Sequence, residues 1–206
     1  MNNFNLTAVV KNLLIINVLV FIAFQTVFQG SYELFGLWYF ENPNFQTYQI
    51  VTHFFMHDNH SFFHIIFNMY ALATFGPMIE MVWKAKRFLF FYLFCGLGAA
   101  VFSLSVDYVQ VHYYGYAQPG AMMVGASGAI YGLLTAFALM YPRQKMGMLF
   151  IPIMIEARYA ILLFAGLEIF QGLGNFGTGV AHFAHLGGMI SGAGLIYYWR
   201  LFGSRL

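Results

Sequence analysis

Apolar segments of about membrane-span length recur along this sequence, and they constrain its fold more than any other feature. An α-helix needs about 20 mainly apolar residues to cross the hydrocarbon core of a bilayer. Charged residues make up only 8% of the chain and hydrophobic residues 61%, whereas a typical soluble domain is about 25% charged. Because so few charges cannot cover a water-exposed surface, the sequence predicts an all-α integral membrane protein.

Six spans are expected, and they form a single domain over residues 1–206. The segment at 147–158 is also apolar, but it contains Pro152 and follows Pro142. Because proline interrupts a helix, we expect an interfacial loop there and not a seventh span. The expected spans are residues 12–28, 62–83, 88–106, 124–140, 159–173 and 180–201.

The basic residues predict the orientation of these spans. They lie before the first span, between the second and third, between the fourth and fifth, and at the end of the sixth. They are Lys11, Lys84, Lys86, Arg87, Arg143, Lys145, Arg158, Arg200 and Arg205. By the positive-inside rule both termini are cytoplasmic, so the second, fourth and sixth spans enter from the outer side. The net charge of +2 is too small to indicate a nucleic-acid partner.

Polar side chains that can do chemistry are expected at one depth of the bilayer. Ser127 is predicted about one turn inside the outer end of the fourth span. His182 and His185 lie at the outer end of the sixth, and His64 and Asn68 share one face near the outer end of the second. Because ionisable residues are costly within a membrane, they are candidates for function.

A serine beside a histidine is a nucleophile with its general base. The pair is predicted to be Ser127 with either His182 or His185. His64 and Asn68 could donate hydrogen bonds to an oxyanion, together with the Ser127 amide at the start of a helix. Such chemistry needs no cofactor and no metal, and none is expected.

Glycines are spaced so that the fourth and sixth spans can pack closely. Gly128 and Gly132 are four residues apart, as are Gly188 and Gly192. Small residues at this spacing let the backbones of membrane helices approach each other. This packing would bring Ser127 to a histidine of the sixth span.

Three motifs together resemble the signature of the rhomboid intramembrane serine proteases. They are GASG at 125–128, HIIFN at 64–68 and AHLGG at 184–188, followed by a glycine at 192. The resemblance covers nearly the whole chain and implies a six-span rhomboid-like bundle. Glycines three and seven residues after the histidine fit His185 and do not fit His182.

The resemblance implies a role for each matching residue. Ser127 would be the nucleophile and His185 the general base, without an acidic third member. His64 and Asn68 would help to form the oxyanion hole. The supporting residues would be Tyr131, packed beneath the histidine, with Gly125, Gly128, Gly188 and Gly192.

The resulting prediction is an endopeptidase that cleaves single-span membrane proteins near the outer face of the bilayer. Residues 172–179 could act as a lid over the site, and a gap beside the fifth span could admit substrate. No cleavable signal, extended terminus or soluble domain is evident, which favours a bacterial plasma-membrane protein. Its oligomeric state is not predicted.

Two alternatives stay open. Five histidines in 57–64 and 182–185 could belong to a metal-dependent membrane enzyme, or the chain could be an inactive relative that binds membrane helices. Glu168, in the fifth span, is expected to pair with a histidine or to stay protonated. The only aspartates, Asp58 and Asp107, are expected in outer loops, which excludes an intramembrane aspartyl dyad.

Overall fold

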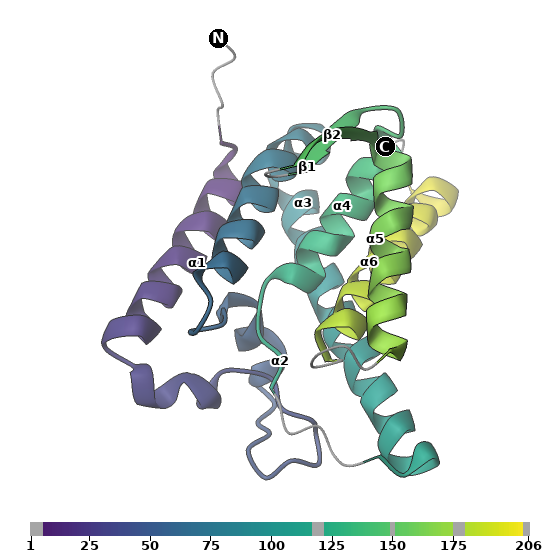
Figure 1. Cartoon of the computed structure of the whole chain (residues 1–206). Coiled ribbons are helices and arrows are strands. Elements are labelled where there is room, and N and C mark those ends of the chain that lie inside the picture. The colour runs from purple at the N-terminus through teal and green to yellow at the C-terminus, as the bar shows by residue number, and fades with distance from the viewer. Residues whose placement is uncertain (1–5, 117–121, 149–150, 175–179, 204–206) are drawn as a thin grey trace.

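The computed structural model describes residues 6–116, 122–148, 151–174 and 180–203 (Figure 1). A helix occupies each of the six ranges predicted to be spans, because one long helix covers both the second and the third. The α-helices are α1 Ala8–Thr26, α2 Gln49–Thr52, α3 Phe62–Tyr114, α4 Ser127–Met140, α5 Ala157–Leu173 and α6 Val180–Phe202. Two 3-10 helices, η1 Gln29–Leu34 and η2 His53–Phe55, and two strands, β1 Lys145–Met148 and β2 Ile151–Glu156, complete the described elements.

Helix α3 is two helices that meet at Lys84. The backbone of Lys84 has φ 65° and ψ 164°, which is not helical, so the chain changes direction there. Next to this break, Trp83 packs edge-on against Trp199 of α6, with 5.3 Å between ring centroids. The Arg87 guanidinium lies 4.0 Å above the Trp199 ring, a cation–π contact. The end of α6 is therefore packed beside the break.

The second half of α3 continues past the predicted end at residue 106 as far as Tyr114. Asp107, predicted to lie in an outer loop, is consequently within a helix, and its side chain is buried. The aspartyl dyad was excluded because both aspartates were expected in loops, and for Asp107 that reason no longer holds. Asp58 is outside every helix, as predicted.

Helix α4 lies at the centre of the bundle, packed between α3 and α6. Ten of its 14 residues are buried. At 1.5 Å per residue its 14 residues span roughly 21 Å, which is less than the hydrocarbon core of about 30 Å. By its length, α4 is too short to cross the hydrocarbon core on its own.

Ser127 is the first residue of α4 and not one turn inside it, which corrects the prediction. The helix starts late because Gly125 adopts φ +119°, a conformation that side chains other than glycine rarely adopt. A Cβ atom at Gly125 would also lie 2.9 Å from the His64 ring. Glycine therefore sets both the start of α4 and the approach of His64.

The two ends of the bundle are built differently (Figure 1). The start of α1, the break in α3, the strands and the end of α6 gather at one end. At the other end, the segment containing η1, α2 and η2 packs against the chain that leads into α4. Leu37 and Met123 form an isolated β-bridge there, and the Gly125 N–H donates to the His53 carbonyl at 2.9 Å.

The strands β1 and β2 form an antiparallel hairpin where the sequence predicted an interfacial loop. Lys145 pairs with Glu156, and Met146 pairs with Ile155. Pro152 prevents a helix in this segment, but proline is compatible with an edge strand. Among the described residues between α4 and α5 there is no seventh helical span, as expected, and the segment expected to be a loop contains the two strands.

The start of α1 is fixed by a carboxylate from α3. Glu80 accepts hydrogen bonds from Thr7 Oγ1 at 2.5 Å, from the Val9 amide at 3.0 Å and from the Val10 amide at 2.9 Å. The first N–H groups of a helix have no acceptor within the helix, and a negative charge there is favourable. Glu80 thus caps α1 from a neighbouring helix.

Two of the described helices, α1 and α3, are long and apolar enough to cross a membrane, and α4 is a shorter apolar helix. Large apolar side chains point away from the bundle, among them Leu19 of α1, Val101 of α3 and Leu162 of α5. Extended apolar surface of this kind is unfavourable in water and matches the interior of a bilayer.

Candidate active site

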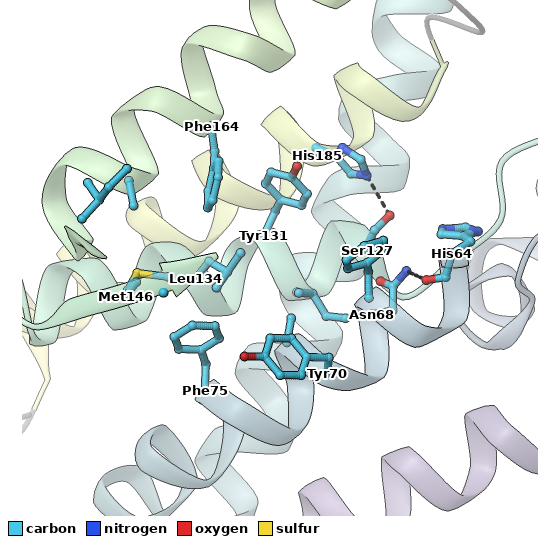
Figure 2. A pocket seen from close by; sticks show the side chains of 16 residues that line it. His64, Asn68, Tyr70, Phe75, Ser127, Tyr131, Leu134, Met146, Phe164 and His185 are labelled. Atoms are coloured by element: carbon cyan, nitrogen blue, oxygen red, sulfur yellow. Dashed lines mark hydrogen bonds between the residues drawn. The ribbon is translucent and has the colours of Figure 1, made fainter. Parts of the chain in front are cut away.

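Ser127 and His185 meet where the start of α4 faces α6. The Ser127 Oγ atom lies 2.8 Å from His185 Nε2, which is hydrogen-bonding distance (Figure 2). Both side chains are partly buried. The alternative partner, His182, is directed elsewhere, so the structure brings Ser127 to the histidine that the glycine spacing favoured.

The glycines of α4 and α6 make this contact geometrically possible. A Cβ atom at Gly188 would lie only 1.9 Å from the carbonyl oxygen of Gly128. One turn further along, a Cβ atom at Gly192 would lie 3.0 Å from the carbonyl oxygen of Gly132. The two backbones are therefore in direct contact, and this contact sets the distance between Ser127 and His185.

Tyr131 supports the histidine from α4. It follows Ser127 by one helical turn, and its ring stacks on the His185 ring with 4.2 Å between centroids and 10° between planes. The stacking leaves His185 little freedom to rotate about its side chain. Its Nε2 atom is thereby kept toward Ser127.

His64 and Asn68 lie on the other side of Ser127, at the start of α3. His64 Nδ1 accepts a hydrogen bond from the Asp58 amide at 3.2 Å. In the neutral ring this leaves the proton on Nε2, where it can be donated. Asn68 uses one N–H to bond the His64 carbonyl at 2.7 Å and keeps a second N–H. Both residues can therefore supply donors beside the Ser127 hydroxyl.

A cavity of about 510 Å³ opens from this site between α3, α4, α5 and the hairpin. Its walls are mostly apolar. Ser127, His185, His64 and Asn68 line one end, and Met146 of β1 lies toward the other (Figure 2). A smaller cavity of about 220 Å³, on the α3 side of Ser127, shares Ser127, His64 and His185 with the first. Ser127 thus stands where the two cavities adjoin.

Glu168 of α5 is a buried carboxylate next to the histidine. Its Oε2 atom accepts a hydrogen bond from His182 Nδ1 at 2.7 Å, and its Oε1 atom accepts one from the Tyr131 hydroxyl. Oε1 also lies 3.0 Å from His185 Nδ1, an ion-pair distance without hydrogen-bond alignment. The predicted pairing of Glu168 with a histidine therefore involves two histidines and a tyrosine. An acid in an apolar helix was the only sequence signal for this cluster.

Other histidines lie near the site without joining the serine–histidine contact: the His57 ring is 5.3 Å from the His64 ring, and His53 lines the smaller cavity. His53 and His57 are buried in the segment before α3, and burial lowers the pKa of each from 6.5 to about 4. His53 bonds the Gln49 carbonyl through Nδ1 at 2.8 Å. His112 lies in the last turn of α3 and forms an ion pair with Glu41 at 3.0 Å. Neither His53 nor His112 contributes to the contact between Ser127 and His185.

Of the predicted metal-ligand histidines, two meet a carboxylate. Among the described residues, Glu168, His182 and His185 each present one ligand atom, and these atoms lie within 4.8 Å of one another. Carboxylate and imidazole are ligands that zinc accepts. Glu168 also contacts both rings directly, at 2.7 Å from its Oε2 to His182 Nδ1 and 3.0 Å from its Oε1 to His185 Nδ1.

The fold and the site define a helical membrane protein with a serine and a histidine in contact at a buried cavity. The family model for the rhomboid domain matches residues 44–202. The chain therefore belongs to the rhomboid family, and the resemblance drawn from its three motifs is confirmed.

Relatives of the chain carry rhomboid names. It is 33% identical over 148 residues to presenilin-associated rhomboid-like protein A, mitochondrial, from Danio rerio, covering 69% of this chain and 37% of that protein. It is 28% identical over 140 residues to rhomboid protein 1, mitochondrial, from Saccharomyces cerevisiae, covering 68% and 38%. It is 26% identical over 161 residues to rhomboid-like protease 3 from Toxoplasma gondii, covering 76% and 53%. The match thus spans about a third to a half of each relative.

Proposed function

We propose that this protein is an intramembrane serine endopeptidase that cleaves transmembrane proteins near the outer face of the bilayer. The observation that carries this proposal is the 2.8 Å contact between Ser127 Oγ and His185 Nε2 at the end of a buried cavity. The family membership supports it, and one relative is itself named as a protease.

The reaction follows from the arrangement of the side chains. His185 Nε2 removes the proton of Ser127 as its oxygen attacks the substrate carbonyl, and the imidazolium then protonates the leaving amine. Negative charge develops on the carbonyl oxygen in the tetrahedral intermediate. His64, Asn68 and the N–H groups at the start of α4 can donate hydrogen bonds to it. Water then hydrolyses the acyl-enzyme at the same serine.

The membrane arrangement that we propose has six spans in a single domain over residues 1–206. It treats α3 as two spans that meet at Lys84 and includes α1, which Glu80 ties to α3. The end of the bundle that carries the basic residues would face the cytoplasm. Ser127 would then lie below the outer surface, because the short α4 starts inside the bilayer.

The larger cavity suggests how a substrate reaches the serine. It extends between α3 and α5 from Ser127 toward the hairpin, and aromatic side chains such as Phe67 and Phe164 line it. A transmembrane helix hides its peptide bonds in its own hydrogen bonds. A substrate segment must therefore unwind at Ser127, which favours small or helix-breaking residues near the cleaved bond. Most of the lid predicted at 172–179 lies outside the described residues.

The proposed substrates are single-span proteins embedded in the same bilayer. The rhomboid domain and the apolar helices support a membrane location. A bacterial plasma membrane stays a prediction from the sequence, and two of the named relatives are mitochondrial.

The metal-dependent alternative has one observation in its favour, the cluster of Glu168, His182 and His185. Turnover of a model membrane substrate after dialysis against a chelator separates the two mechanisms. A serine mechanism predicts unchanged turnover in the metal-free protein. Loss of turnover that returns on addition of Zn²⁺ would favour the metal mechanism.

Covalent labelling tests the proposed nucleophile and also the alternative of an inactive helix-binding relative. A serine-directed fluorophosphonate probe should modify Ser127 in the detergent-solubilised protein, and peptide mass spectrometry would locate the modification. Labelling should fall sharply in His185→Ala, because the hydroxyl is weakly nucleophilic without its base. A folded wild type that stays unlabelled at Ser127 would contradict the proposal.

A further inference from the structure

Three groups surround the carboxylate of Glu168: His182, Tyr131 and His185. Its residue is only 7% exposed, and a buried charge needs paired or hydrogen-bonded neighbours. His182 Nδ1 satisfies Oε2 at 2.7 Å, and the Tyr131 hydroxyl satisfies Oε1. The additional contact, 3.0 Å from Oε1 to His185 Nδ1, reaches the histidine that faces Ser127.

The second relevant atom is His185 Nδ1 itself. It is buried, and no group among the described residues meets it in hydrogen-bond geometry. Glu168 Oε1 lies 3.0 Å from it. Charge-bearing contacts in resting active sites are often poorly aligned and tighten when the substrate binds. The 3.0 Å separation is already a hydrogen-bonding distance, so only the angle has to improve for Glu168 to accept from Nδ1.

We infer that Glu168 is a positioning residue that extends the Ser127–His185 pair to a Ser–His–Glu triad. The inference rests on the proposed protease function. A carboxylate at Nδ1 holds the ring proton there and leaves the lone pair of Nε2 directed at Ser127. The resemblance to rhomboid proteases implied a dyad without an acidic member, so this carboxylate is a feature of this chain beyond that pattern.

The proton and the electrons can be followed through the step. The bond from Ser127 Oγ to the substrate carbon forms, the carbonyl π electrons move to the carbonyl oxygen, and the hydroxyl proton moves to His185 Nε2. The imidazolium then lies between Ser127 Oγ, which is now bonded to the substrate carbon, and the carboxylate of Glu168. Glu168 stays ionised throughout and stabilises the positive ring by its charge. The carbonyl π bond then re-forms, the bond from the substrate carbon to nitrogen breaks, and the nitrogen takes the proton from His185 Nε2. The amine product leaves and His185 is neutral again.

The groups around this cluster come from three other elements. Tyr131 reaches the carboxylate from α4, His182 reaches it from the first turns of α6, and His64 of α3 faces the site from beyond Ser127. His182 and Tyr131 hold the two carboxylate oxygens in place. Glu168 is thereby oriented by groups that do not themselves contact Ser127 in a hydrogen bond.

The test is Glu168→Gln, which keeps the size of the side chain and removes its charge, with Glu168→Asp as the conservative variant. We expect kcat to fall by about 10²-fold or more, within the range of up to about 10⁴ seen when a triad carboxylate becomes an amide. KM should stay within about 2-fold, because substrate binding does not involve the carboxylate. Glu168→Asp should recover part of kcat. ¹⁵N NMR of the histidine rings should show His185 protonated at Nδ1 in the wild type and a reduced Nδ1–H population in Glu168→Gln.

Glu80→Gln is the matched control, since Glu80 is equally buried, at 5% exposure against 7%, but caps α1 at the other end of the bundle. It should lower the unfolding temperature and leave kcat and the His185 spectrum of the folded protein unchanged. An unchanged His185 tautomer in Glu168→Gln would overturn the inference. The wild type could instead show this tautomer and its dependence on Glu168 but cleave no membrane substrate. That result would overturn the protease proposal, while the positioning of His185 by Glu168 would still hold.

Discussion

Replacement of Gly188 by alanine should disable the site without touching either reacting group. The added Cβ atom would lie 1.9 Å from the Gly128 carbonyl oxygen, and ordinary contacts begin at 3.4 Å. Even a tight contact of 3.0 Å requires α4 and α6 to separate locally by more than about 1 Å. The same separation would stretch the 2.8 Å contact between Ser127 and His185 beyond hydrogen-bonding distance.

The magnitude follows from these distances. A misplacement of about 1 Å in a catalytic pair can cost on the order of 10²-fold in rate, and overpacking a close helix contact costs about 1–3 kcal/mol of stability. We expect both effects in Gly188→Ala, measured as turnover of a model membrane substrate and as thermal unfolding in detergent. Gly194→Ala, on the same helix, is the matched control because nothing lies within 4 Å of its added Cβ. Wild-type turnover in Gly188→Ala would refute the idea that close glycine packing sets the site.

Two further predictions concern stability away from the reaction. Glu80→Ala should lower the free energy of unfolding by about 1–3 kcal/mol, because it removes a charged acceptor from buried donors of α1; thermal unfolding measures this, and unchanged stability would argue that the cap is unimportant. Burial lowers the pKa of His53 and His57 to about 4, so the unfolded chain binds more protons than the folded protein between pH 6.5 and 4. The contribution of these two neutral histidines to the free energy of unfolding is therefore complete above pH 6.5 and is lost as the pH falls toward 4. The unfolding temperature should drop over that window, and less steeply in His57→Gln; equal slopes in the two proteins would contradict the assignment.

The helices were predictable because their signals are local. Apolar length fixed the six helical ranges, and the run of basic residues at 84–87 marked where the second and third meet. The late start of α4 was not predictable from hydropathy, because it depends on the backbone conformation of Gly125 against the His64 ring. The hairpin at 145–156 was missed because an apolar segment with a proline indicates no helix but does not distinguish a strand from a loop.

The sequence predicted which residues form the site, but it predicted only some of the contacts between them. Glycine spacing and motif order brought Ser127 and His185 together, and the resemblance to rhomboid proteases implied the place of Tyr131 beneath the histidine. The pairing of Glu168 with a histidine was expected as one of two outcomes, but its particular partners were not, because they depend on how α5 packs beside α6. The sequence of a span shows which polar residues it contains, but it does not show which neighbouring helix those residues face.

Cleavage of a model single-span substrate in reconstituted bilayers tests the central claim, the catalytic contact between Ser127 and His185, most directly. Wild type, Ser127→Ala, His185→Ala and the double variant would be compared at equal amounts of folded protein. Because the two residues act as a unit, each single variant should lose nearly all turnover and the double variant should lose little more. Cleavage by Ser127→Ala at the wild-type rate would contradict the account.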